Sequence, residues 1–277
     1  MQHTHISAKQ SLFDLKLREF WQYRDLIWLF TRRSFMVSYM QTVLGPLWLF
    51  INPLLTSITY VVLFGKIAKL STDGVPQLLF YLSGNAVWTF FSGCVTTNAS
   101  TFTNNASLFG KVYFPRLVMP VSSVLSKLIL YGIQMLMVLA LLLWYALKGF
   151  VAPMWRLWIL LPLLLIQLGV LGMGVGIIIS SLTTKYRDLR ILVDFGMSLW
   201  MYATPVVYPL STVNEDLRRL ILLNPVTPVM ECYRRILLGV GQVDSGYFAY
   251  SLVLTLVVAI AGILIFNYIE RTFMDNI

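Results

Sequence analysis

Side chains that could carry acid–base, nucleophilic or metal chemistry are scarce in this chain of 277 residues. Its two histidines, His3 and His5, stand in the polar N-terminal segment, which excludes a histidine-based triad or metal site within the apolar regions. Lys66 and Lys111 each follow a glycine, but the upstream glycine and the following hydroxyl residue of a phosphate-binding loop are missing. The sequence therefore predicts no cofactor, metal or nucleotide site in the chain itself.

The other candidate groups do not form a recognisable active site. Cys94 and Cys232 lie far apart in unlike surroundings and are expected to be apolar fillers. Asp188 and Asp194 are six residues apart, so they do not share a helical face as the paired carboxylates of an intramembrane enzyme would. Lys127 and Asp194 fall inside apolar runs, where they could pair with each other or extend to the membrane surface. We therefore predict that the chain is not an enzyme.

The composition is that of a membrane protein. Hydrophobic residues make up 58% of the chain and charged residues 12%, against about 25% charged in soluble domains. The formal charge of +9 is distributed between apolar runs and is not gathered in one basic cluster with interleaved aromatics. We therefore expect membrane lipid around this chain and no nucleic acid as its partner.

The apolar runs predict a single all-α transmembrane domain over residues 1–277 with six spans, at 42–64, 78–99, 120–147, 157–182, 191–203 and 247–268. Pro46 and Pro53 should interrupt the first span, and the GxxxG spacing of Gly172 and Gly176 predicts close helix packing in the fourth. A helix over 11–33, with aromatics opposite charged side chains, is expected to lie in the membrane interface. Packing on a soluble partner would give the same pattern.

The stretch between the last two spans fits neither a span nor a solvated loop, because prolines interrupt an apolar sequence. It predicts two short helices that dip into the membrane over 211–241, with Asn224 and Pro225 between them and Glu231 paired to Arg235 at i,i+4. Lysines and arginines number 12 on the side of both termini and 8 on the other. We therefore expect cytoplasmic termini and interpret this stretch as an outer gate.

Two tryptophans, Trp88 and Trp200, are placed near the middle of their spans, where an interfacial aromatic belt does not explain them. Packing in the core or against lipid is one explanation. The other is a substrate pathway lined by flat aromatic faces on which sugar rings can slide. We assign Trp48 and Tyr202 to the same lining, and both explanations stay open on the sequence alone.

Four short motifs occur in an order that resembles a known transporter family. They are RRSFMVSYMQTVLGPLWLFINP at 32–53, KVYFPRLVMPVSSV at 111–124, KYRDLR at 185–190 and LNPVTPVMECYRRILLG at 223–239. Together they resemble the permeases of polysaccharide-exporting ABC transporters in the type-2 exporter superfamily, and within it the O-antigen branch. Exporters of capsule or teichoic acid, and permeases that export small molecules or drugs, are the alternatives left open.

The resemblance implies an assembly that the residues alone do not. This chain would form a homodimer bound to two copies of a separate ATPase subunit, which would hold ATP and magnesium, in the cytoplasmic (inner) membrane of a bacterium. The cargo would be a glycan on a polyprenyl diphosphate lipid. The helix over 11–33 would be an interface helix, and the segment 104–114 would contain a coupling helix seated on the ATPase.

The resemblance also implies roles for individual residues. Contacts with the ATPase would be made by Phe109, Lys111, Tyr113 and Arg116. A second contact would be made by Tyr186, Arg187 and Asp188, although Asp188 could instead cap a helix. The outer gate would comprise Asn224, Pro225, Glu231, Tyr233, Arg234 and Arg235.

Overall fold

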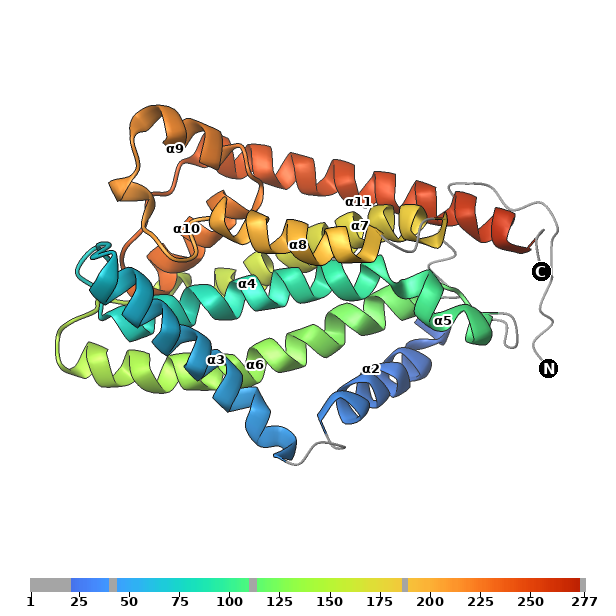
Figure 1. The fold of residues 1–277 in the computed structure, drawn as a ribbon, viewed down its shortest axis with the longest axis horizontal. Coiled ribbons are helices and arrows are strands. Elements are labelled where there is room, and N and C mark those ends of the chain that lie inside the picture. The colour runs from blue at the N-terminus through green and yellow to red at the C-terminus, as the bar shows by residue number, and fades with distance from the viewer. Residues whose placement is uncertain (1–20, 40–43, 110–113, 186–188, 275–277) are drawn as a thin grey trace.

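A computed structural model describes residues 21–39, 44–109, 114–185 and 189–274, and all regular structure within these ranges is helical (Figure 1). The predicted all-α fold is confirmed. The α-helices are α2 (Arg24–Tyr39), α3 (Trp48–Tyr60), α4 (Gln77–Ala99), α5 (Thr101–Phe109), α6 (Val118–Leu147), α7 (Leu161–Lys185), α8 (Leu189–Tyr202), α9 (Glu215–Leu222), α10 (Val226–Leu238) and α11 (Ser245–Met274).

Five stretches of the described chain are long and apolar enough to cross a membrane: Gly45–Ile67, Gln77–Ala99, Val118–Leu147, Trp155–Thr183 and Ser245–Asn267. They coincide with five of the six predicted spans. The remaining prediction, 191–203, corresponds to α8, which has 14 residues. A helix of that length extends only about 21 Å, against a hydrocarbon core of about 30 Å. A sixth crossing therefore stays a prediction.

The first span is irregular at the positions its prolines predict. Pro46 lies in the 3-10 turn Gly45–Leu47. Pro53 lies inside α3, where its carbonyl oxygen accepts a hydrogen bond from Ser57 Oγ at 2.7 Å. The helix then continues as a π-helical stretch, Val61–Ile67. Because proline removes a backbone donor and π turns change the helical register, this span is not one straight α-helix.

Helix α4 is the centre of the bundle. In its most apolar part, 78% of the residues are buried, whereas only 17% are buried in the corresponding parts of the spans that contain α3, α6 and α11. Its neighbours are α3, α6, α7 and the short helices α8 and α10. Since lipid rather than water surrounds an apolar bundle, the outer helices can keep large hydrophobic side chains exposed. Helices α3, α6 and α7 therefore pack directly on α4, whereas α11 packs on α7 and α2 packs on α6.

Glycines of α7 let its neighbours approach closely. A Cβ on Gly172 would lie 2.8 Å from a side-chain carbon of α4, and one on Gly176 would lie 2.6 Å from Asn98 Cβ. On the opposite side, a Cβ on Gly262 of α11 would lie 3.0 Å from the carbonyl oxygen of Gly174. The predicted close packing at the GxxxG spacing is confirmed, and α7 is held between α4 and α11.

Helix α2 corresponds to part of the helix predicted over 11–33, and residues 11–20 lie outside the described ranges. It runs along α6, where the fully buried Thr31 donates to a carbonyl oxygen of α6 at 3.3 Å. Trp21 and Trp28 are 69% and 61% exposed. The exposed surface of this segment therefore combines large aromatic side chains with charged ones such as Arg24 and Asp25, as a helix in a membrane interface would.

The two ends of the bundle differ. Helices α9 and α10 lie at one end, whereas α5, the start of α2 and the last turns of α11 lie at the other (Figure 1). The two short helices predicted within 211–241 are present as α9 and α10. Gly239 ends α10 with a left-handed φ of 79°, a conformation that glycine adopts without strain.

Candidate functional site

Helix α10 carries a buried ion pair. Arg234 and Glu231 have side chains that are 1% and 2% exposed, and Arg234 Nη1 lies 3.3 Å from Glu231 Oε1. Arg234 also donates to two carbonyl oxygens of the loop after α8, from Nη2 to Val206 at 2.8 Å and from Nη1 to Tyr208 at 3.3 Å. Its guanidinium carbon lies 4.1 Å from the ring centroid of Phe80. One side chain thus joins α10, this loop and α4.

The second oxygen of the Glu231 carboxylate is satisfied by the backbone, because Oε2 accepts a hydrogen bond from Gln242 N at 2.9 Å. Burial lowers the pKa of Arg234, and the Glu231 carboxylate opposes this by raising it. A guanidinium keeps its proton in proteins, so Arg234 is a buried cation. Breaking a buried pair by removing one partner destabilises a protein by about 3–5 kcal/mol.

The predicted partner of Glu231 was wrong. The expected pair with Arg235 at i,i+4 is replaced by a pair with Arg234 at i,i+3. Arg234 faces the interior, whereas Arg235 is exposed and donates from Nη1 to the carbonyl oxygen of Gly241 at 3.2 Å. Both spacings bring side chains together on a helix surface, so only the packing of α10 against the bundle selects between them.

Asn224 joins the end of α8 to the start of α10. Its Oδ1 accepts hydrogen bonds from Trp200 Nε1 at 3.0 Å and from Val226 N at 3.1 Å. Its Nδ2 donates to Thr204 Oγ1 at 2.8 Å. Because both ends of the amide have partners, the turn between α9 and α10 is held against α8.

Two further contacts tie α10 to the long helices. The Tyr233 hydroxyl lies 2.7 Å from the Tyr131 hydroxyl of α6. The carbonyl oxygen of Pro225 accepts from Ser251 Oγ of α11 at 2.5 Å, and that hydroxyl accepts from Gln167 Nε2 of α7 at 3.0 Å. Five of the six predicted gate residues, all except Arg235, therefore make polar contacts that hold α10 and its start within the bundle, and we call these five residues the α10 polar cluster.

The four aromatics assigned to a substrate pathway do not form one surface. Trp88 is 5% exposed, and its ring lies 5.6 Å from Phe91, which lies 5.2 Å from the ring of Trp200. Tyr202 is 54% exposed at the end of α8, and Trp48 is half-buried at the start of α3. Phe91 was not among the predicted pathway residues, although its i,i+3 spacing from Trp88 indicates a shared helix face. A pathway role for Trp88 would require α4 to separate from α8.

At the other end of the bundle, α5 is attached to α7 and α11. The carbonyl oxygen of Ala99, the last residue of α4, accepts from Thr183 Oγ1 of α7 at 2.9 Å. Phe102 stacks on Phe266 of α11 with ring centroids 4.9 Å apart. The helix runs from Thr101 to Phe109, so it begins three residues before the predicted segment 104–114.

Most of the predicted ATPase contacts lie outside the described residues. These are Lys111, Tyr113, Tyr186, Arg187 and Asp188. Phe109 is the last residue of α5, and Arg116 is buried. Phe114 lies between these two, with its ring 5.8 Å from that of Phe30. Helix α2 therefore contacts the segment that follows α5.

The suggested pairing of Lys127 with Asp194 is not found in the part of the chain that the structure describes. The Lys127 stem lies against α4, where a Cβ on Gly93 would be 3.0 Å from its Cδ. Asp194 is exposed on α8. The alternative, in which each side chain extends separately toward a membrane surface, remains a prediction.

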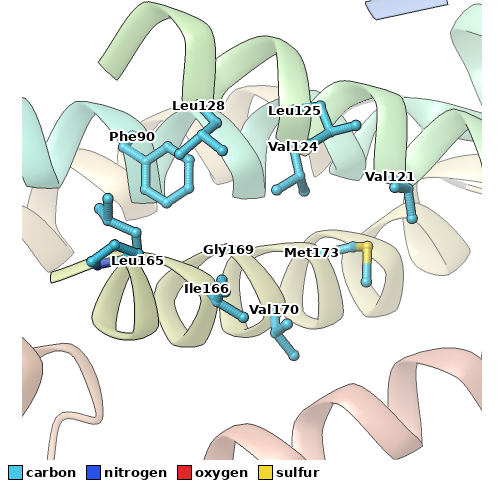
Figure 2. Close-up of a pocket in the computed structure, with 11 residues that line it drawn as sticks. Phe90, Val121, Val124, Leu125, Leu128, Leu165, Ile166, Gly169, Val170 and Met173 are labelled. Atoms are coloured by element: carbon cyan, nitrogen blue, oxygen red, sulfur yellow. The ribbon is translucent and has the colours of Figure 1, made fainter. Parts of the chain in front are cut away.

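A groove of about 340 Å³ lies between α6 and α7, with Phe90 of α4 beside it (Figure 2). All of its lining side chains are apolar. Gly169 keeps it open, since a Cβ there would lie 3.1 Å from Val124 and 3.3 Å from Phe90. Burying a sugar or a charge against such a surface is unfavourable, so this groove suits hydrocarbon.

The fold and these contacts define a multi-pass all-α membrane protein with a polar cluster at one end of an otherwise apolar bundle. Residues 25–238 match the ABC-2 type transporter family, and the chain belongs to that family. The resemblance that the motifs predicted is thereby confirmed.

Two relatives that are similar to this chain along most of its length are permease proteins of O-antigen export systems. The chain is 31% identical over 224 residues to the O-antigen export system permease protein RfbA of Myxococcus xanthus, covering 79% of this chain and 83% of the relative. It is 26% identical over 251 residues to the O-antigen export system permease protein RfbA of Klebsiella pneumoniae, covering 91% of this chain and 94% of the relative.

Proposed function

We propose that this chain is the transmembrane permease subunit of an ATP-driven O-antigen exporter. The observation that carries the proposal is its similarity, along most of its length, to O-antigen export permeases. The five apolar stretches of membrane-spanning length in the described residues are suited to the transmembrane part of such a transporter. ATP hydrolysis belongs to a separate subunit, because the sequence contains no phosphate-binding loop.

In the proposed assembly, two copies of this chain enclose the pathway and two copies of the ATPase subunit bind ATP and magnesium. The assembly lies in the bacterial cytoplasmic (inner) membrane with both termini of the chain in the cytoplasm. The cargo is a glycan on a polyprenyl diphosphate lipid. The α5 end then faces the ATPase, and the α9–α10 end forms the outer gate.

Helix α4 gives this proposal a mechanical connection between the two ends. It has 23 residues, a length of about 35 Å. One residue, Ser100, separates it from α5, and its Phe80 contacts Arg234 of the α10 polar cluster near the opposite end. A displacement of α5 by the ATPase would therefore be transmitted along α4 to the gate as a rigid-body movement.

Loss of this chain in its bacterial host tests the function. We expect O-antigen to disappear from the cell surface and the lipid-linked glycan to accumulate at the cytoplasmic face, with both effects reversed by re-expression. Unchanged surface O-antigen would contradict the proposal. Accumulation of a capsule or teichoic acid precursor instead would assign the chain to one of those exporters.

A further inference from the structure

A second cavity, at the α9–α10 end, is polar and has a volume of about 480 Å³. It is lined by Arg218 of α9, Arg235 of α10 and the segment 242–245 that leads into α11. Two guanidinium groups from different helices therefore border one space. We call it the Arg218–Arg235 cavity.

The arginines of this cavity have unused hydrogen-bonding capacity. Arg218 Nε is buried and has no hydrogen-bond partner, and among the described residues no carboxylate pairs with Arg218 or Arg235. The adjacent Arg219, by contrast, pairs with Glu215 at 3.6 Å. A buried donor without an acceptor is unfavourable, and a ligand that supplies an acceptor would remove this penalty.

The acidic residue of the cavity does not neutralise the two arginines. Asp244 Oδ1 accepts hydrogen bonds from Gly246 N at 2.8 Å and Tyr247 N at 3.4 Å, at the start of α11. Two guanidinium groups and one carboxylate leave the lining with a net positive charge. An anion with several acceptor oxygens matches the forked geometry of arginine, and phosphate is the best-suited biological group of this kind.

Helix α9, beside the cavity, has the features of a helix that lies at the surface of a bilayer. Leu217, Leu220 and Leu223 follow each other at intervals of three residues and are 55%, 63% and 51% exposed. Leucines at this spacing form one side of a helix, which inserts among the outer parts of the acyl chains when charged residues flank it. Arg218 directly follows Leu217, so a helix α9 that lies in this way would bring the Arg218 guanidinium close to lipid phosphates.

We propose that the Arg218–Arg235 cavity binds the phosphate group of a membrane lipid. Two sources share this chemistry: the headgroup of a bilayer phospholipid and the diphosphate of a polyprenyl-linked cargo. The first source is independent of the function proposed above, whereas the second rests on it.

Lipid retention by the full-length chain in lipid nanodiscs tests the inference. Native mass spectrometry compares phosphatidylglycerol, a polyprenyl diphosphate and diacylglycerol, which has no phosphate. Wild type should retain phosphate-bearing lipid and not diacylglycerol. Arg218→Gln and Arg235→Gln should each weaken retention about tenfold, the effect of losing a charged hydrogen bond. Arg219→Gln, which alters the neighbouring arginine outside the cavity, should bind as wild type.

Retention of phosphatidylglycerol that depends on Arg218 identifies the bilayer as the source, and retention of the polyprenyl diphosphate alone identifies the cargo. The inference is overturned if both glutamine variants bind these lipids as wild type does, or if diacylglycerol binds equally well. Arg218→Lys keeps the positive charge but loses the forked guanidinium group, so this variant should bind at an intermediate level. It provides the test if Arg218→Gln fails to fold. O-antigen output is not measured, so this inference and the proposed function fail separately.

Discussion

At the residue scale, Arg234 has the most demanding environment in the described structure. Its guanidinium is almost fully buried and has an anionic partner, two carbonyl acceptors and an aromatic face around it. Isolated charges are strongly disfavoured in such surroundings, and these partners compensate for most of the lost water, although Arg234 Nε has no hydrogen-bond partner among the described residues. The same set makes Arg234 difficult to replace.

We expect Arg234→Gln to lower the stability of the chain by about 3–5 kcal/mol, because Glu231 would stay buried without its cation. The control is Arg219→Gln, which removes an exposed ion pair with Glu215 and should change stability by less than about 1 kcal/mol. The free energy of unfolding in mixed lipid–detergent micelles measures both. Equal effects of the two substitutions would show that the buried pair is not a structural requirement.

Trp200 can be tested for packing and transport together. Trp200→Phe keeps an aromatic ring against Phe91 but removes the donor to Asn224, and it should lower stability by about 1–3 kcal/mol while retaining glycan export. Trp200→Ala should lose both stability and export. Glycan on the cell surface, normalised to the amount of permease, is the readout. Normal export by Trp200→Ala would reduce this residue to a packing role.

At the element scale, the packing of α7 depends on its glycines, which have no side chain to keep the neighbouring helices apart. Its glycines allow contact with α4 on one side and α11 on the other, and van der Waals packing is a main source of helix association within a membrane. The apolar content of the helix predicts only that it inserts. Its closeness to both neighbours comes from Gly172, Gly174 and Gly176.

Gly176→Ala should destabilise the bundle by about 1–3 kcal/mol, because the added Cβ meets α4 and the two helices must separate. Gly132→Ala in α6 is the matched control, since nothing lies within 4 Å of the Cβ it would add. There the gain in helix propensity should leave stability unchanged or raise it by up to about 1 kcal/mol. The unfolding temperatures of both purified variants measure these effects, and an unfolding temperature unchanged by Gly176→Ala would contradict the packing argument.

At the scale of the whole molecule, the described chain provides helices for a membrane pathway without a motor of its own. A permease of this kind has to contact an ATPase through one end, and the proposal assigns that contact to the α5 end. The α10 polar cluster at the opposite end is tied to α4, α6, α8 and α11. The gate should therefore move together with the bundle and not as a loose flap.

An affinity-tagged copy of the chain should co-purify with a subunit that contains a phosphate-binding loop. Substituting both Phe109 and Tyr113 with alanine should reduce the co-purified ATPase at least about tenfold, as expected when aromatic anchors of an interface are removed. Phe150→Ala is the control, because Phe150 is 59% exposed and follows α6 at the other end of the bundle. Full transport by the chain without any ATPase would refute the assembly.

The sequence by itself determined the properties that depend on neighbours along the chain. Apolar length predicts the spans, Pro46 and Pro53 predict an irregular first span, and the Gly172–Gly176 spacing predicts close packing, because each follows from local geometry. The span predicted at 191–203 was less well determined, because the sequence of a short apolar run does not show whether the helix crosses the membrane by itself.

Only the tertiary structure decided which side chains meet. It paired Glu231 with Arg234 and not with Arg235, buried Trp88 behind Phe91, and brought Arg218 and Arg235 to the border of one cavity. Helical spacing permits several partners for each of these residues, and the choice depends on which face of the helix is turned toward the bundle. That orientation is set by the packing of all the helices together, which no single stretch of the sequence contains.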